Sequence, residues 1–423
     1  MSFPRYPAYK DSGVEWLGEV PEHWEVLPIK RIASLQSGTG ITADSITDEG
    51  PFPVYGGNGV RGYTDANTHE GHFPIIGRQG ALCGNINYAK GGFWASEHAV
   101  VVTPCKQVEV HWLGETLRAM NLNQYSVSAA QPGLSVEAIV NLFIPWPPRD
   151  EQRTISTFLD HETAKIEALI AEQQHLIELL QEKRQAVISH AVTKGLNPDA
   201  PMKDSGVEWL GEVPEHWTLK RLKHLSPNLT VGIVVNPSEY VSDEGLPFIY
   251  GGDIREGVID WENSRRIAPA LSDKQAKTHL RSGDLLMVRV GAPGITAVVP
   301  AECEGGNCAS VMLIRQGSFS SQWLCFTLNT RIVRFQVEVV QYGAAQEQFN
   351  ISHAVNFWLP VPPRQEQDRI ATFLLSEHEK AQGLILQAQN AVSLLQERRS
   401  ALISAAVTGQ IDVRGLVPEA SAA

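Results

Sequence analysis

The 423-residue chain lacks the sequence signatures of several large enzyme classes. It contains no Gly-Lys dipeptide, which excludes a Walker A phosphate loop, and no G-x-G-x-x-G between a strand and a helix. The His-Glu-x-x-His motif of zinc proteases and the Gly-x-Ser-x-Gly nucleophile elbow are missing. So is the Asn/Asp-Pro-Pro-aromatic signature of adenine amino-methyltransferases, to which Asn236-Pro237-Ser238 is the nearest approach. We therefore expect a non-catalytic protein without a cofactor or metal of its own.

Hydrophobic runs, cysteines and positive charge are also scarce. No apolar run reaches membrane-spanning length, and Met1–Arg5 lacks a signal-peptide core, so we expect a cytoplasmic protein that does not contact a membrane. The five cysteines are scattered, and Cys303 and Cys308 form the only close pair, which favours free thiols in a core over a zinc site. The net charge of −12 argues against nucleic-acid binding by bulk electrostatics alone. DNA binding would need local basic surface or positively charged partners.

A long segment occurs twice in the chain. Its opening, Pro145–Gln152 (PWPPRDEQ), returns 215 positions later as Pro360–Gln367 (PVPPRQEQ), and its close, Leu179–Arg184, returns as Leu394–Arg399. Prolines precede each copy, and Asp150 and Glu151 lie where the positive end of a helix dipole favours anions. Each copy is therefore predicted to form one long helix.

Apolar residues follow a 3.5-residue period in both copies, which is typical of a coiled coil. The predicted seam is Ile155, Leu159, Ile166, Leu169, Leu176, Leu180 and Val187 in the first copy, and Ile370, Leu374, Ala381, Leu384, Ala388, Ala391, Leu395 and Leu402 in the second. A helix from Arg149 to Val192 would be roughly 65 Å long, and an antiparallel pair is the simplest closure. The alternative is two independent amphipathic helices on separate cores.

A second repeat precedes each domain-sized region. Lys10–Trp24 (KDSGVEWLGEVPEHW) is identical to Lys203–Trp217, and we call these two segments the arms. We expect Trp16, Leu17, Val20 and Trp24 to anchor the first arm by packing, rather than to contact a ligand. Basic residues follow each arm and are equally consistent with phosphate contacts and with a solvated surface: Lys30 and Arg31, then Lys220, Arg221, Lys223 and His224.

Two glycine-rich regions of short β-branched runs follow the arms, at about 34–144 and 225–359, with a helix expected near His111–Leu122. Shared landmarks such as Tyr-Gly-Gly and Arg-x-Gly-Ala recur in both at growing offsets, so the second region carries insertions. The predicted class is α+β, with two pseudo-repeated mixed α/β domains joined by two long helices packed as an antiparallel coiled coil. Predicted boundaries are 1–148 (arm and first domain), 149–196 (central helix), 197–363 (second arm and domain), 364–410 (C-terminal helix) and 411–423 (tail).

Polar side chains in the loops of both regions are candidates for DNA contact. Arginine can pair with guanine, and glutamine or asparagine with adenine, in the major groove, whereas lysine and tyrosine more often hold phosphates. The candidates are Arg61, Tyr63, Arg78, Gln79, Asn85, Lys90, Gln124 and Gln131 in the first region, and Arg255, Arg265, Arg266, Lys277, Arg289, Gln341 and Gln346 in the second. Arg78 and Arg289 share the Arg-x-Gly-Ala loop, which suits a phosphate contact common to both regions.

Together these motifs resemble the specificity subunit of type I restriction–modification systems. The resemblance rests on the arms, the Tyr-Gly-Gly-Asn-Gly-Val-Arg-Gly-Tyr loop at 55–63, and the starts and ends of both predicted helices. It implies two target recognition domains that each read one half of a split double-stranded DNA site, with the helices as spacer. It also implies two modification subunits that bind S-adenosylmethionine and flip the target adenine, and restriction subunits that use ATP and Mg. On this interpretation, acidic helices face partner subunits.

A coiled-coil adaptor whose paired domains bind proteins, without a DNA target, is the alternative function. The acidic net charge is its best support.

Overall fold

The computed structural model describes residues 3–80, 82–126, 133–226, 228–341 and 350–416. They form two compact units, one of Met1–Gln174 with Gln389–Ala423, the other of His175–Ala388. The two long helices, α3 (Arg149–Lys194) and α8 (Arg364–Val407), each contribute residues to both units. Each unit therefore contains one arm, one domain and part of both long helices.

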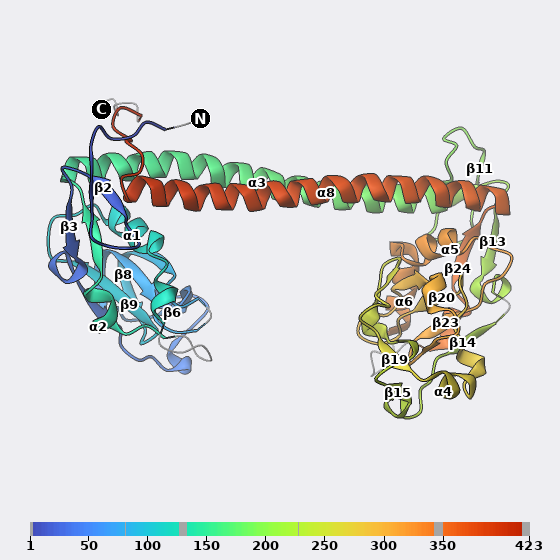
Figure 1. Cartoon of the computed structure of the whole chain (residues 1–423). Coiled ribbons are helices and arrows are strands. Elements are labelled where there is room, and N and C mark those ends of the chain that lie inside the picture. The colour runs from blue at the N-terminus through green and yellow to red at the C-terminus, as the bar shows by residue number, and fades with distance from the viewer. Residues whose placement is uncertain (1–2, 81, 127–132, 227, 342–349, 417–423) are drawn as a thin grey trace. The chain divides into compact units, whose positions relative to one another are not determined.

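Within each unit the two long helices run antiparallel, side by side (Figure 1). In the first unit, Leu159 near the start of α3 shares a core with Ala406 near the end of α8, and Arg399 Nη2 lies 3.1 Å from Glu167 Oε1. In the second unit, Val192 near the end of α3 shares a core with Ile370 near the start of α8. The predicted α+β class with an antiparallel helical pair is confirmed.

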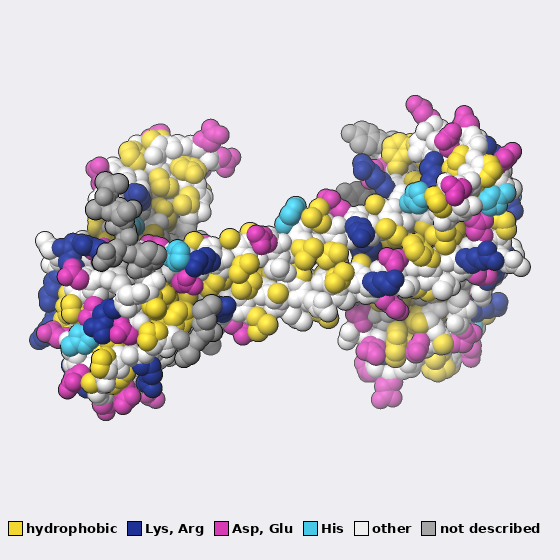
Figure 2. All heavy atoms as spheres, turned by 90° about the horizontal axis from the view of Figure 1, so that it is seen from above, with side chains coloured by type: hydrophobic (Ala, Val, Ile, Leu, Met, Phe, Trp, Pro, Cys, Tyr) yellow, Lys and Arg dark blue, Asp and Glu magenta, His cyan; other side chains and the backbone are white. Residues whose placement is uncertain are grey.

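Three of the predicted seam positions are wrong. Leu169 and Leu176 of α3 are 45% and 42% exposed, and Leu384 of α8 is 49% exposed. A straight helix has 3.6 residues per turn, so its inner face drifts by ~20° per heptad relative to a strict seven-residue repeat. Positions such as Ile170 of α3 and Ile385 of α8 face inward instead. Apolar side chains consequently remain on the surface of the long helices (Figure 2).

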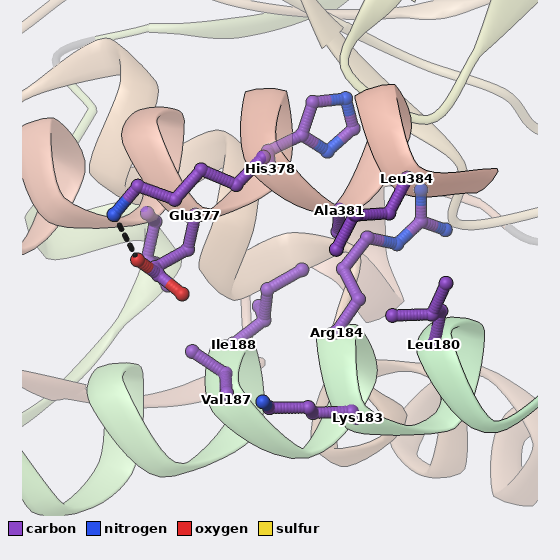
Figure 3. Close-up of a pocket in the computed structure, with 11 residues that line it drawn as sticks. Leu180, Lys183, Arg184, Val187, Ile188, Glu377, His378, Ala381 and Leu384 are labelled. Carbon is purple, nitrogen blue, oxygen red and sulfur yellow. Dashed lines mark hydrogen bonds and ion pairs between the residues drawn. The ribbon is translucent and has the colours of Figure 1, made fainter. Parts of the chain in front are cut away.

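The helical pair is also incompletely packed within the second unit. A cavity of about 200 Å3 lies between α3 and α8, where Arg184 reaches toward Ala381 and Leu384 (Figure 3). The small side chain of Ala381 leaves this space, and an ion pair between Lys380 and Glu377 (2.8 Å) borders it.

Both arms form the same β-hairpin. Strand β1 (Tyr9–Asp11) pairs with β2 (Glu19–Pro21), and β11 (Met202–Asp204) pairs with β12 (Glu212–Pro214) in the same register. Leu17, Val20 and Trp24 are buried, and Trp16 donates its indole N–H to the Phe143 carbonyl at 3.0 Å. The arm residues are therefore packing anchors, as predicted.

The Glu-Gln pair at the start of each long helix holds neighbouring segments in place, which gives a structural reason for its occurrence in both copies. In the first unit, Glu151 accepts a hydrogen bond from Trp24 Nε1 (2.9 Å) and lies 2.6 Å from His23 Nε2. The buried Gln152 accepts the Glu109 backbone N–H (3.2 Å) and donates to the Pro147 carbonyl (3.0 Å). The glutamate thus holds the arm against the helix, and the glutamine holds the domain.

The second unit repeats the histidine and glutamine contacts but not the indole bond, since Trp217 Nε1 has no hydrogen-bond partner among the described residues. His216 Nε2 lies 2.8 Å from Glu366 Oε2. Gln367 accepts the Ser320 N–H and donates to the Pro362 carbonyl, both at 2.9 Å. The repeated Glu-Gln residues therefore make a repeated connection between arm, domain and helix, which we call the joint.

The first domain is built on a six-stranded sheet of order β4-β9-β7-β8-β5-β6, in which only the β5–β8 pair is parallel. The short helix α1 (Val110–Ala119) packs on β7 and β8, close to where a helix was expected. A separate pair of β3 (Glu25–Pro28) with β10 (Phe143–Trp146) closes the domain. The six strands are β4 (Ala33–Ser37), β5 (Phe52–Gly56), β6 (Gly59–Thr64), β7 (His69–Gly77), β8 (Ile86–Ala95) and β9 (Ala99–Pro104).

The second domain keeps this strand order in two pieces. Its first sheet, β14-β23-β20-β21, corresponds to β4-β9-β7-β8, and its second has the order β15-β19-β16-β22. Strand β16 pairs with β22 in parallel, as β5 pairs with β8. The single long strand β8 is replaced by β21 (Thr296–Val298) and β22 (Asn307–Cys308), with a 3-10 helix between them, so the sheet divides there. Most of the predicted insertion lies elsewhere, between the Tyr-Gly-Gly and Arg-x-Gly-Ala landmarks, where the offset grows from 195 to 211 residues.

Besides these two sheets, the second domain contains two separate two-stranded pairs and several short helices. β13 (Thr218–Arg221) pairs with β24 (Trp358–Val361), as β3 pairs with β10. The others are β14 (Leu229–Val231), β15 (Val241–Ser242), β16 (Leu246–Ile249), β17 (Ile254–Arg255), β18 (Val258–Ile259), β19 (Arg265–Ile267), β20 (Leu285–Met287), β23 (Met312–Ile314), α4 (Pro269–Asp273), α5 (Ser321–Leu328), α6 (Arg331–Gln341) and α7 (Ile351–Ala354).

A buried polar network attaches α1 to the first sheet. Glu115 accepts hydrogen bonds from the Tyr88 hydroxyl (2.9 Å) and from Arg118 Nε (3.0 Å). His111 Nδ1 lies 2.9 Å from Asp160 of α3, so the network also reaches the long helix. Burial alone would raise the pKa of Glu115, but its hydrogen bonds and the charge of Arg118 lower that pKa to about 2. Glu115 is therefore a buried anion, and the network around it joins α1, β8 and α3.

The cysteines Cys303 and Cys308 are free and lie in a hydrophobic core, as predicted. Burial raises the pKa of Cys308 to about 12. In the described part of the chain, no helix is both long and apolar enough to cross a membrane.

Candidate nucleic-acid interface

Three loops of the first domain meet at one place on its surface. They are the tip itself, the loop that follows β7, and the turn between β8 and β9. The tip and the end of β7 approach so closely that a Cβ on Gly77 would lie 2.0 Å from the Gly57 carbonyl oxygen. A Cβ on Gly57 would lie 2.9 Å from the Gln79 carbonyl oxygen. Only glycine at these two positions permits this arrangement.

The three loops enclose an open hollow with a volume of about 630 Å3. Its polar lining comes from Asn58, Arg61, Gln79 and His98. Two apolar side chains also line it, Val60 and Leu82, which are 49% and 50% exposed. Exposed hydrogen-bonding groups beside exposed apolar groups are the combination that reads base edges in a DNA groove.

Hydrogen bonds fix the side chains of the hollow before any ligand binds. His98 Nδ1 lies 2.9 Å from Gln79 Oε1, and His98 Nε2 lies 3.1 Å from Glu97 Oε1. Asn85 donates to Asn58 Oδ1 at 3.0 Å. The Arg78 N–H donates to the His98 carbonyl at 2.8 Å, which holds the two loops together.

The structure gathers some of the predicted contact residues of the first domain and separates others. Arg61 and Gln79 line the hollow, and Asn85 and Arg78 belong to the loop that forms it. Gln124 lies in a short 3-10 helix (Leu122–Tyr125) next to this loop. The two segments are so close that a Cβ on Gly84 of the loop would lie 2.6 Å from the backbone nitrogen of Asn123. Tyr63 and Lys90 lie on β6 and β8, outside the lining of the hollow, and Gln131 lies outside the described residues.

The candidates of the second domain are distributed over several elements. Arg255 lies on β17, Lys277 lies in a 3-10 helix (Ala276–Thr278), and both are exposed. Arg265 on β19 stacks over the Tyr250 ring at 4.2 Å, and Arg266 donates to the Glu262 carbonyl at 3.1 Å. Arg289 Nη2 donates to Asn350 Oδ1 at 3.1 Å. Gln341 ends α6 without a described side chain, and Gln346 lies outside the described residues.

Sequence reasoning missed two residues of the hollow, Asn58 and His98. The Asn-Gly pair at 58–59 is a hairpin signal, which could have placed Asn58 at an exposed tip. His98 has no such signal, since its contact with Gln79 joins two loops that only the sheet brings together.

The long helices carry only a small part of the acidic net charge. Helices α3 and α8 together hold 11 Lys and Arg against 13 Asp and Glu, for a net charge of −2. Each arm has four acidic residues and one basic residue, so the two arms supply half of the net charge of −12. The arm carboxylates Asp11, Glu15, Glu19 and Glu22 are all exposed, as are their counterparts in the second arm.

Comparisons with known proteins agree with these features. Residues 21–179 match the family model of the type I restriction modification DNA specificity domain. The type I restriction enzyme EcoprrI specificity subunit of Escherichia coli is 42% identical over 133 residues, which is 30% of this chain and 33% of that protein. The match therefore spans about a third of that relative's length. The EcoBI specificity subunit of Escherichia coli is 25% identical over 343 residues, 75% of this chain and 70% of that protein.

Residues 21–179 thus match the type I restriction modification DNA specificity domain, and the chain is similar over most of its length to specificity subunits of type I restriction enzymes. Solved structures support the fold. A chain from a study of complex assembly and conformational transition of the type I R-M system superposes with a TM-score of 0.68 at 18% identity, covering 92% of this chain and 98% of that chain. The HsdS subunit from Thermoanaerobacter tengcongensis gives a TM-score of 0.50 at 18% identity, covering 93% and 98%. The family-model match and the EcoBI relative do not support the adaptor alternative.

Proposed function

We propose that this chain is a non-catalytic DNA reader in which each recognition domain binds one half of a bipartite double-stranded site. The observation that carries the proposal is the repeated joint. Each domain is fastened by its own arm and glutamine to the start of a long helix, Gln152 in one unit and Gln367 in the other. Two readers attached in the same way to one helical pair suit a site with two halves at a fixed separation.

The exposed loops supply the contacts in this proposal. Arg61, Gln79 and Asn85 would read base edges from the first domain, with Arg78, Tyr63, Lys90, Gln124 and Gln131 contacting phosphates or neighbouring groups. In the second domain Arg255, Arg265, Arg266, Lys277, Arg289, Gln341 and Gln346 would share these tasks. Arg265 is already held in place by stacking on Tyr250, which lowers the entropy lost on binding. The specific contacts must be local, because the chain as a whole is acidic.

Two modification subunits are the proposed partners for methylation, and restriction subunits for cleavage. In the proposal S-adenosylmethionine, ATP and Mg bind to these partners, and target-adenine flipping falls to the methyltransferase. Two copies of one partner require two equivalent docking surfaces. The identical acidic arms provide such a pair, and exposed apolar side chains such as Leu169 and Leu386 offer further contact area on the long helices.

The test is to co-express the chain with the modification subunits of its system and to map methylated adenines across the host genome. We expect a two-part motif with a fixed gap that is absent when this chain is omitted. If a well-expressed, associated complex leaves methylation unchanged, the DNA-reading function is wrong and protein binding becomes the better account.

A further inference from the structure

The Gln79 side chain is exposed, yet its orientation is fixed. Its amide oxygen lies 2.9 Å from His98 Nδ1, whose ring is also held by Glu97 at 3.1 Å. The backbone hydrogen bond from the Arg78 N–H to the His98 carbonyl holds the two loops together, and so keeps the Gln79 and His98 side chains next to each other. A glutamine held in this way loses little conformational freedom when it binds a ligand.

The remaining hydrogen-bonding capacity of Gln79 matches one base. With both ring nitrogens as donors, His98 gives its Nδ1–H to Gln79 Oε1 and its Nε2–H to Glu97 Oε1, and it leaves the second lone pair of the glutamine oxygen available. Among the described residues no other hydrogen bond to the Gln79 amide is present, so its N–H groups remain available too. One acceptor and one adjacent donor complement N6 and N7 of adenine in the major groove.

Apolar groups stand beside this amide. Val60 at the hairpin tip and Leu82 in the following loop line the same hollow and are about half exposed. An apolar side chain next to a base-reading amide can contact the C5-methyl group of thymine, which is the partner of adenine. The glycines of the tip, such as Gly57 and Gly59, place no side chain that would keep a base edge away.

We propose that Gln79 specifies an A·T base pair in the half-site read by the first domain, and that His98 is the positioning residue that orients its amide. This inference rests on the proposed function. It adds a specificity-determining residue, the base pair that it reads, and a contact that sequence reasoning did not find.

The first experiment measures Gln79→Ala in the complex with modification subunits, by genome-wide mapping of methylated adenines. We expect one A·T position of the first half-site to become degenerate, with discrimination there falling about 5- to 150-fold. The second half-site and the gap should not change. Gln36→Ala, which alters an exposed glutamine on β4 outside the hollow, is the matched control and should retain the full motif.

The second experiment tests the positioning role of His98. His98→Ala should reduce discrimination at the same single position, whereas His98→Asn, which retains a nitrogen near the place of Nδ1, should restore much of it. A merely structural role would instead lower thermal stability and total methylation without selecting one position. Melting temperatures of the variants separate the two cases.

Binding to defined duplexes covers the case in which methylation is lost altogether. The purified complexes are titrated with oligonucleotides that vary each position of the first half-site. Equal weakening of Gln79→Ala on every duplex overturns the inference, as does an unchanged motif. A wild-type complex that shows no bipartite motif at all would instead refute the proposed function.

Discussion

Gln367 Oε1 accepts the backbone N–H of Ser320 at 2.9 Å, while the amide nitrogen of Gln367 donates to the Pro362 carbonyl at 2.9 Å. One buried side chain therefore fastens the first turn of α8 both to Pro362, the residue that follows β24, and to the start of α5 in the second domain. Gln152 makes the corresponding pair of bonds in the first unit. This amide therefore helps to orient each domain on its helix, together with the hydrophobic core that domain and helix share.

Replacing Gln367 by alanine should destabilise the second unit. The Ser320 N–H and the Pro362 carbonyl would both be left buried without a partner, at a cost of about 1–3 kcal/mol in the free energy of unfolding. Denaturant unfolding measures this loss. Gln365→Ala, an exposed neighbour on the same turn, should change stability by less than about 0.5 kcal/mol. Equal effects of the two substitutions would contradict the role of the joint.

The lowered pKa of Glu115 predicts that the free energy of unfolding of the first unit falls at acid pH, which we call the acid limb. Its pKa in the folded chain is about 2, below the ordinary value of 4.5, because its hydrogen bonds from His111 and Tyr88 and the charge of Arg118 outweigh burial. The stabilisation is thus fully present above pH 4.5 and is lost as the pH falls toward 2, with a total on the order of 2–3 kcal/mol. Glu115→Gln should flatten this limb, measured by unfolding at several pH values. The exposed Glu137→Gln should leave it unchanged, and an unaltered limb in Glu115→Gln would refute the assignment.

The spacer role predicts that helix length controls the gap between half-sites. Four residues inserted after Gln173 would lengthen α3 by about 6 Å and shift its register against α8. We expect a changed gap in the methylated motif, or loss of bipartite methylation. The same four residues placed after Leu416, beyond α8, serve as the control. An unchanged gap in the α3 variant would rule out a ruler.

Independent domains predict that exchange of one alters only one half-site. Replacing residues 225–359 by the second domain of another specificity subunit should give a new second half-site, with the first half-site and the gap retained. Methylome mapping reads both halves at once. A change in both halves would show that the two domains do not read independently.

The acidic arms predict the number of partner copies. Reversing two charges in one arm, Glu19→Lys with Glu22→Lys, should reduce the complex from two modification subunits to one, because these carboxylates are exposed and identical in both arms. Reversal in both arms, with Glu212→Lys and Glu215→Lys added, should remove the remaining copy as well. Native mass spectrometry counts the copies. Two bound copies in the fourfold variant would exclude the arms as docking surfaces.

Local sequence patterns were sufficient for much of the fold. Proline, acidic residues and an apolar period fixed where α3 and α8 begin, because these features act within a few residues of each other along the chain. The same patterns misplaced Leu169, Leu176 and Leu384, because the inner face of a helix depends on how much the pair supercoils. That quantity belongs to two helices together.

By itself the sequence determined the repeated plan of arm, domain and helix, and the residue types available for reading DNA. Similar segments that recur in the same order record duplication directly, and recognising them needs no knowledge of contacts. Only the tertiary structure decided that Gln79 meets His98 and that Arg61 shares their hollow while Lys90 does not. Those neighbours come from separate loops of one sheet, and strand order, which sets such distances, is fixed by packing and hydrogen bonding across the whole domain.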